Sequence, residues 1–133
     1  MQYYTKRPVD ASFEEAIELT REALAEEGFG VLAEIDVTAK MEEKLDLSEF
    51  RDYRILGACN PPLAKQGLDA EVDLGVLLPC NVVVYVDDDG RTIVSAVDPG
   101  AMLSVVGRDD LDPIAAEVDE RLSRVLASLP GAE

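Results

Sequence analysis

The sequence predicts an α+β protein in which an antiparallel sheet carries two long helices packed on one face. Three observations predict this fold: an amphipathic helix near the N-terminus, a β-hairpin pattern in the second half of the chain, and an amphipathic helix at the C-terminus. Strand candidates between them give the order β-α-β4-α, with short helical insertions. A chain of 133 residues is long enough to bury a core, so we expect residues 1–133 to form a single domain.

The first elements are a short strand and a long helix. The segment YYTKRPV, residues 3–9, is the strand candidate. Ser12 and Glu15 match a capping box at the start of the helix, and Gly28 stands where a left-handed C-cap is expected. The inward stripe of the helix repeats at helical spacing and consists of Ala16, Ile17, Thr20, Ala23 and Leu24.

The middle of the chain predicts two further strands, each followed by a short helix. Residues 29–37, FGVLAEIDV, alternate between apolar and acidic side chains, which predicts a strand with one face in water. Thr38 is the expected cap of the short helix that follows. Residues 52–58, DYRILGA, predict a central strand, and the pair Asn60-Pro61 is typical of a helix start because Asn caps and Pro suits the first turn.

The second half of the chain predicts a hairpin and a final helix. Residues 81–97, NVVVYVDDDGRTIVSAV, form two β-branched arms around an Asp-Asp-Gly turn. A calcium loop does not fit, because counting from Asp87 the position that needs glycine is Thr92 and the twelfth residue is Asp98. The final helix begins at Asp112, and its apolar stripe is Ile114, Val118, Leu122, Val125 and Leu129.

The charge of the chain limits its partners. There are 28 acidic and 12 basic residues, for a formal net charge of −16. A field of this sign repels phosphate backbones and anionic lipid surfaces, so we expect neither nucleic acid nor a membrane as partner. The acidic residues are spread along the chain, which is typical of halophilic proteins, where concentrated salt screens the repulsion. The alternative is an acidic protein of a low-salt organism.

The remaining composition bears on location and chemistry. No apolar run approaches the roughly 20 residues of a membrane span, and the N-terminus lacks the apolar core of a signal peptide. We therefore expect a soluble cytoplasmic protein with reduced thiols. The chain has no histidine, which excludes Ser-His-Asp and Cys-His catalysis and His-based metal sites. Neither standard phosphate-binding glycine motif occurs, so no cofactor is identified and no catalytic constellation is recognisable.

Two Cys-Asn pairs, Cys59-Asn60 and Cys80-Asn81, are the candidate site. Cys59 ends a strand and precedes a helix N-terminus, a position that lowers the pKa of a thiol. Cys80 begins the next apolar strand and would lie beside Cys59 if the two strands are neighbours. Such a pair could form a reversible disulfide, carry sulfane sulfur or bind a soft metal, although a tetrahedral zinc site would need two more ligands from a dimer partner. The alternative is that both cysteines are buried packing residues.

The other candidates in this stretch also have two interpretations. Asn60 and Pro61 fit a helix start, and Asn81 fits a turn before a strand, without any function. Asp98 is either a carboxylate presented at the end of a strand or a turn former. The candidate ligand-binding or thiol residues are therefore Cys59, Asn60, Pro61, Cys80, Asn81 and Asp98.

The stretches ILGACNPPLAKQGL and LGVLLPCNVVVY, followed by VDP before a helical tail, resemble the family catalogued as domain of unknown function 302. The resemblance covers most of the chain. It implies a TATA-binding-protein-like β-α-β4-α fold and a homodimer, with no established reaction. It also implies a link to sulfur handling, because some members are associated with rhodanese-like proteins. The fold name does not imply DNA binding, because function depends on the site.

Three functions follow from these observations. The first is a homodimeric binding module, with a pocket near the two Cys-Asn motifs that holds a small molecule or a metal. The second is a thiol redox or sulfur-transfer protein, in which Cys59 attacks and Cys80 resolves. The third is a structural or interaction protein with both cysteines in its core.

Overall fold

The computed structural model describes residues 2–131, and these contain a five-stranded antiparallel sheet in the order β1-β5-β4-β3-β2. The strands are β1 (Tyr4–Val9), β2 (Gly30–Asp36), β3 (Tyr53–Cys59), β4 (Cys80–Val86) and β5 (Thr92–Val97). The α-helices are α1 (Phe13–Glu26), α2 (Val37–Leu45), α3 (Pro61–Ala70), α4 (Pro99–Ser104) and α5 (Asp112–Ser128). Two 3₁₀ helices, η1 (Val72–Leu77) and η2 (Asp109–Leu111), complete the order.

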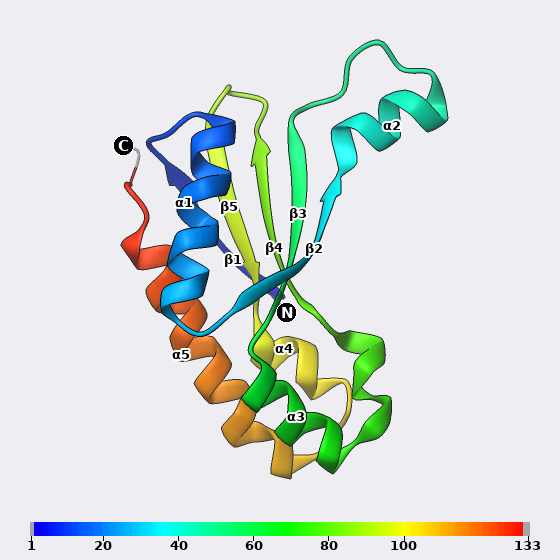
Figure 1. Cartoon of the computed structure of the whole chain (residues 1–133), viewed down its shortest axis with the longest axis vertical. Helices are drawn as coiled ribbons and strands as arrows, with labels where there is room; N and C mark the ends of the chain where they lie inside the picture. The colour runs from blue at the N-terminus through cyan, green and yellow to red at the C-terminus, as the bar shows by residue number, and fades with distance from the viewer. Residues whose placement is uncertain (1, 132–133) are drawn as a thin grey trace.

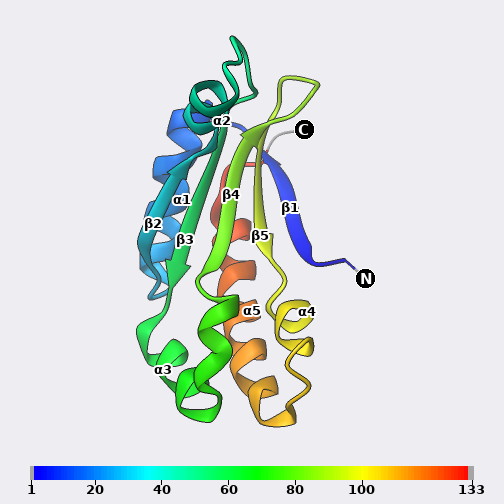
Figure 2. The same ribbon diagram turned by 90° about the vertical axis from the view of Figure 1, so that its right-hand side faces the viewer.

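The two long helices cover one face of the sheet and leave the other face open. Figures 1 and 2 show α1 and α5 together on one side, while α2 projects from the opposite side at one end of the strands. Helices α3 and α4 lie beyond the other end of the strands. The predicted α+β arrangement, with two long helices on one face, is confirmed. Among residues 2–131, no helix is both long enough and apolar enough to cross a membrane.

The core lies between the sheet and the two long helices. Successive side chains in a strand point to opposite faces, so alternate residues of each strand reach this core. On the three inner strands these residues are Leu56, Ala58, Val82, Val84, Val94 and Ala96, all buried. They form one cluster with the inward stripes of α1 and α5. Burial of one Val or Leu side chain in such a cluster stabilises the folded state by about 1.5–3 kcal/mol.

The two long helices, α1 and α5, have the predicted inward stripes, and α1 has the predicted N-cap. The hydroxyl of Ser12 accepts a hydrogen bond from the Glu15 amide at the start of α1, and Gly28 after its end has a φ of 82°. The predicted stripe of α1 is buried: Ala16, Ile17, Thr20, Ala23 and Leu24. In the predicted stripe of α5, Val118, Leu122, Val125 and Leu129 are buried and Ile114 is half-buried.

The hairpin of β4 and β5 is also confirmed, with its turn between Asp87 and Arg91. The carboxylate of Asp87 accepts hydrogen bonds from the amides of Asp89 and Arg91, and Gly90 takes a positive φ of 80°. The aspartates of this turn therefore organise the turn itself, which agrees with the rejection of a calcium loop.

Strand β2 differs from its prediction. The alternation in residues 29–37 predicted a single wet face, but most of β2 is exposed on both faces. A register irregularity between Val31 and Ala33 breaks the two-residue period, and Leu32 at this point is 70% exposed. Strand β2 is also an edge strand, paired with β3 alone, so its outer side has no neighbour to cover it.

Helix α2 begins two residues earlier than a Thr38 cap would place it. The carboxylate of Asp36 caps the helix by accepting the Ala39 amide at 2.9 Å. The Thr38 hydroxyl instead donates to the carbonyl of Arg51 and accepts from the amide of Tyr53, and so ties α2 to the start of β3. None of the residues of α2 is buried.

Candidate functional site

The structure brings the two cysteines together at one end of the sheet. Strands β3 and β4 are neighbours, and Ala58 pairs with Cys80 in their ladder. Cys59 and Cys80 line the same cavity of about 40 Å³, which is enclosed by residues of α3, η1, α4 and α5. This proximity is what the sequence predicted for neighbouring strands. The walls are almost entirely apolar, and the space is far smaller than the roughly 300 Å³ of a small ligand site.

The cavity does not activate either thiol. Burial raises the pKa of the Cys59 thiol above its usual value. Burial, together with the neighbouring Cys59, raises the pKa of Cys80 to about 11. The expectation that the start of α3 lowers the pKa of Cys59 is therefore wrong, because apolar side chains surround the sulfur and desolvate the thiolate. Both cysteines carry protonated thiols at neutral pH.

Asn60 and Pro61 build the start of α3. The side-chain oxygen of Asn60 accepts the Leu63 amide at 3.3 Å, and its side-chain nitrogen donates to the Glu27 carbonyl at 3.5 Å. Pro61 occupies the first turn, where its missing N–H costs nothing. The predicted cap is confirmed, and the polar atoms of the buried Asn60 side chain serve the fold.

Asn81 and Asp98 lie away from the cavity of the thiols. Asn81 is exposed within β4 rather than in a turn, and it follows the buried Cys80, so its side chain points to the open face of the sheet. The expectation that it closes a turn is therefore wrong. Asp98 caps α4 by accepting the Ala101 amide at 3.1 Å. Of the two Cys-Asn pairs, Cys59, Asn60 and Cys80 thus line the small cavity, whereas Asn81 lies apart from it.

A metal site requires several side chains that coordinate the ion together. Among residues 2–131, no group of three or more His, Cys, Asp or Glu side chains is placed to hold a metal ion. Within these described residues, the two thiols at the cavity therefore have no carboxylate to complete a coordination shell.

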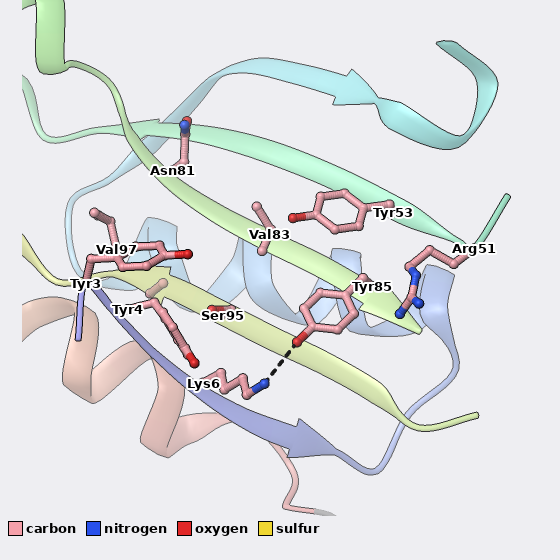
Figure 3. Close-up of a pocket in the computed structure, with 11 residues that line it drawn as sticks. Tyr3, Tyr4, Lys6, Arg51, Tyr53, Asn81, Val83, Tyr85, Ser95 and Val97 are labelled. Atoms are coloured by element: carbon pink, nitrogen blue, oxygen red, sulfur yellow. Dashed lines mark hydrogen bonds between the residues drawn. The ribbon is translucent and has the colours of Figure 1, made fainter. Parts of the chain in front are cut away.

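The open face of the sheet carries a hollow that the sequence did not predict. Its volume is about 510 Å³, within the range of small-molecule sites. Figure 3 shows the residues that line it: Tyr3, Tyr4, Lys6, Arg51, Tyr53, Asn81, Val83, Tyr85, Ser95, Ala96 and Val97. All four tyrosines of the chain are among them, although aromatic residues make up only 5% of the sequence. We call this feature the tyrosine hollow.

Two aromatic pairs stand on either side of the tyrosine hollow. The rings of Tyr53 and Tyr85, opposite each other in the ladder of β3 and β4, are stacked with centroids 5.5 Å apart. The rings of Tyr3 and Tyr4 meet edge to face at 5.1 Å. Val83 lies between the two pairs in Figure 3. This arrangement offers flat aromatic surfaces on which an apolar or aromatic ligand can pack.

The polar groups that line the hollow favour the binding of an anion over that of a cation. In the described part of the chain, residues 2–131, no carboxylate lines the hollow. The Lys6 ammonium lies 3.4 Å from the Tyr85 hydroxyl and 5.6 Å from the centre of the Tyr4 ring. Lys6 takes part in none of the ion pairs within residues 2–131, whereas Arg51 is paired with Asp88 at 2.6 Å. Burial and the neighbouring Tyr85 raise the pKa of Tyr53, so its hydroxyl remains a donor.

Comparison with known proteins supports the fold. A family model described as a domain of unknown function, DUF302, matches residues 5–129. The crystal structure of an uncharacterized conserved protein DUF302 from Bacillus stearothermophilus is similar, with 33% sequence identity and a TM-score of 0.89. The similarity covers 96% of this chain and 98% of the other. None of the curated proteins matches the chain.

Proposed function

The chain belongs to the DUF302 family, and from this premise we propose that it is a binding module for a small organic anion with an aromatic or apolar body. The observation that supports this function is the tyrosine hollow. It gathers every tyrosine of the chain around Lys6, which has no ion-pair partner among residues 2–131. No carboxylate of these residues lines the hollow, although the protein has a net charge of −16. A random part of so acidic a surface would carry several carboxylates.

The division of roles follows from the chemistry of the lining. The Tyr53–Tyr85 stack offers a flat surface for the ligand body. The Lys6 ammonium attracts the anionic group, and the Tyr85 hydroxyl beside it can donate a hydrogen bond to the same group. The Asn81 amide and the Ser95 hydroxyl also line the hollow and add neutral polar contacts.

Concentrated salt is compatible with this proposal. The overall negative charge repels an approaching anion over long distances, which slows association in dilute buffer. In molar salt the Debye length falls to about 3 Å, so the long-range repulsion disappears while the contact with Lys6 at short range persists. Ligand binding in the hollow should therefore be measured at high ionic strength.

The cysteines have a different role in this proposal. Their protonated state and their apolar surroundings favour packing over redox or sulfur-transfer chemistry. A metal site is not favoured either, because within residues 2–131 the two thiols have no further ligand nearby. We therefore propose that Cys59 and Cys80 belong to the structural core at the end of the sheet.

An anionic fluorescent dye tests the proposed function. We expect anilinonaphthalene sulfonate to bind one site per chain in about 1 M KCl. Lys6→Glu should weaken this binding about tenfold, which equals about 1.4 kcal/mol, because it replaces the attracting cation with a repelling carboxylate. The neutral dye phenylnaphthylamine, which has the same aromatic body without the sulfonate, should bind the variant and the parent protein equally.

Lys65→Glu is the matched control for this titration. Lys65 is an exposed lysine on α3, paired with Asp69, and its reversal changes the net charge by the same amount as Lys6→Glu. It should leave both dye affinities unchanged. If both variants weaken binding of the sulfonate dye equally, the effect is one of overall charge, and the tyrosine hollow is refuted as the binding site of the dye.

We further propose that the protein is halophilic, because its acidic surface requires screening. We propose that it is cytoplasmic, because both of its cysteines are free thiols. The melting temperature is expected to rise between dilute and molar KCl at pH 7, as salt screens the repulsion among the carboxylates. Near the isoelectric point of about 4.2 this rise should shrink, because the net charge is then close to zero. A flat or falling melting temperature at pH 7, measured by differential scanning calorimetry, would contradict the halophilic assignment.

A further inference from the structure

We propose that the ion pair between Arg51 and Asp88 makes the tyrosine hollow selective for ligands that carry a single negative charge. Asp88 lies outside the lining of the hollow and is thereby a specificity-determining residue. The ligand class narrows to aromatic monocarboxylates or monosulfonates, and molecules with a second anionic group are disfavoured. This inference rests on the proposed function, because it concerns the selectivity of the same site.

Arg51 lies at the border between two hollows of opposite character. It lines the tyrosine hollow, where Figure 3 shows Lys6 and Arg51 on opposite sides of the Tyr85 ring. It also lines a second hollow of about 550 Å³, which we call the acidic hollow. Five carboxylates line the acidic hollow: Glu42, Glu49, Asp52, Asp87 and Asp88. An anion in the tyrosine hollow and the carboxylates of the acidic hollow therefore compete for the same guanidinium.

The contacts of Arg51 decide this competition in favour of the acidic hollow. The guanidinium donates to the Asp88 carboxylate at 2.6 Å and to the Val86 carbonyl at 3.2 Å. Because Asp88 belongs to the same chain, its effective concentration at Arg51 is on the order of millimolar or above, which a dilute free ligand does not match. A ligand anion therefore gains little by displacing the Asp88 carboxylate.

The hairpin turn holds Asp88 in place beside Arg51. The Val86 amide donates to the Asp52 carbonyl at 3.0 Å, which fastens the end of β4 to the segment that carries Arg51. The Asp87 carboxylate organises the turn that follows, as described above. The Asp88 side chain is 89% exposed, yet its backbone is fixed, so the ion pair is preorganised.

Lys6 is the cation that remains for the ligand. It has no ion-pair partner among residues 2–131, and its ammonium lies 3.4 Å from the Tyr85 hydroxyl. One anionic group is therefore balanced at Lys6. A second anionic group on the far side of the Tyr85 ring meets a guanidinium that is already paired, and the carboxylates of the acidic hollow behind it repel the ligand.

Two naphthalene sulfonates with the same aromatic body test this selectivity in about 1 M KCl. Naphthalene-2-sulfonate carries one negative charge, and naphthalene-2,6-disulfonate carries a charge at each end of its rings. Isothermal titration calorimetry measures both dissociation constants, and the readout is their ratio. We expect the wild-type chain to bind the monosulfonate at least about threefold more tightly than the disulfonate.

Asp88→Asn should shrink this ratio about three- to fivefold, which is the upper range for one exposed ion pair. The substitution suits the same turn and frees Arg51 for the second sulfonate. The double variant Asp88→Asn/Arg51→Gln should lose this gain, because the freed cation is then absent. Circular dichroism confirms that each variant is folded, and a merely structural effect would change both dissociation constants together.

Asp89→Asn is the matched control. Asp89 follows Asp88 in the same hairpin turn and is exposed, and its carboxylate lies 4.0 Å from the guanidinium of Arg91. The substitution changes the net charge by the same amount as Asp88→Asn without touching the ion pair of Arg51. It should leave the ratio of the two dissociation constants unchanged.

The outcomes separate this inference from the proposed function. If neither sulfonate binds, both are overturned. If Lys6→Glu weakens the monosulfonate but the wild-type chain binds the disulfonate equally tightly, the proposed function stands and the charge selectivity is overturned. The role of the Arg51–Asp88 pair is overturned by an unchanged ratio in Asp88→Asn, by an equal change in Asp89→Asn, or by a gain that survives Arg51→Gln.

Discussion

Cys80 in the native protein is expected to react with iodoacetamide at neutral pH about a hundred times more slowly than Cys80 in the unfolded chain. Burial raises its pKa from the ordinary value of 9.0 to about 11 in the folded protein. The thiolate is the reacting form, and its population at neutral pH falls about tenfold for each unit by which the pKa rises. Mass spectrometry of the alkylated chain, sampled over time, measures the two rates.

Cys59 supplies an internal comparison in the same experiment. Its thiol is half-buried and its pKa is also raised by burial, so it should react more slowly than in the unfolded chain but faster than Cys80. A native Cys80 alkylated at the rate of the unfolded chain would show that the cavity opens readily or that its thiol is activated. An activated thiol would restore the sulfur-transfer hypothesis, and ready opening of the cavity would contradict the burial of Cys80.

The same raised pKa makes stability depend on pH in a defined direction. Below about pH 9 the Cys80 thiol is protonated in both states and has no effect. Between pH 9 and about 11 the unfolded chain loses this proton first, so the free energy of unfolding falls as pH rises, by up to about 1.4 kcal/mol per pH unit. Urea unfolding at several pH values measures this slope, and Cys80→Ala should remove the part due to the thiol.

The two asparagines of the Cys-Asn pairs are expected to give opposite results when each is replaced by alanine. Asn60→Ala should lower the free energy of unfolding by about 1–3 kcal/mol, because α3 loses its cap and the Leu63 amide loses its partner. Asn81→Ala should stay within about 0.5 kcal/mol of the parent, because its exposed side chain supports no fold contact. Urea unfolding of both variants at one fixed salt concentration measures the difference.

Binding of the sulfonate dye reverses this order. Asn81→Ala should weaken binding of the dye, because the Asn81 amide lines the tyrosine hollow. The Asn60→Ala protein should bind the dye with the affinity of the parent as long as it is folded. Each variant thus controls for the other, because both remove one side-chain amide from a Cys-Asn pair. An Asn81→Ala protein as destabilised as Asn60→Ala would contradict the assignment of Asn81 to the open face.

Local signals in the sequence were sufficient for most of the fold. The Ser12 cap, the Asp87 turn and the Asn60-Pro61 helix start depend on residues a few positions apart, and the structure has all three. Strand β2 itself was predicted, but the exposure of both its faces was not. A register irregularity near Leu32 interrupts the alternation, and only the pairing with β3 reveals it.

The candidate site was harder to predict because it depends on packing between distant segments. The environment of Cys59 includes Met102 of α4 and Val118 of α5, and the burial that they cause outweighs the start of α3. The tyrosine hollow combines Tyr4, Tyr53 and Tyr85, which are dispersed in the chain and meet only through the strand order. The alternation of Asn81, Val83 and Tyr85 along β4 was the available signal, but only the placement of both long helices shows which face stays open.

The separation of the sheet into a helix-packed side and an open side has a consequence for how such a protein can diversify. Positions such as Leu56, Val82 and Val94 constrain folding, while their neighbours Tyr53, Val83 and Ser95 on the open side do not fill the core. Random substitution of the second set should therefore yield many folded chains with altered ligand preference. One scaffold of this kind can supply a repertoire of receptors without a change in its architecture.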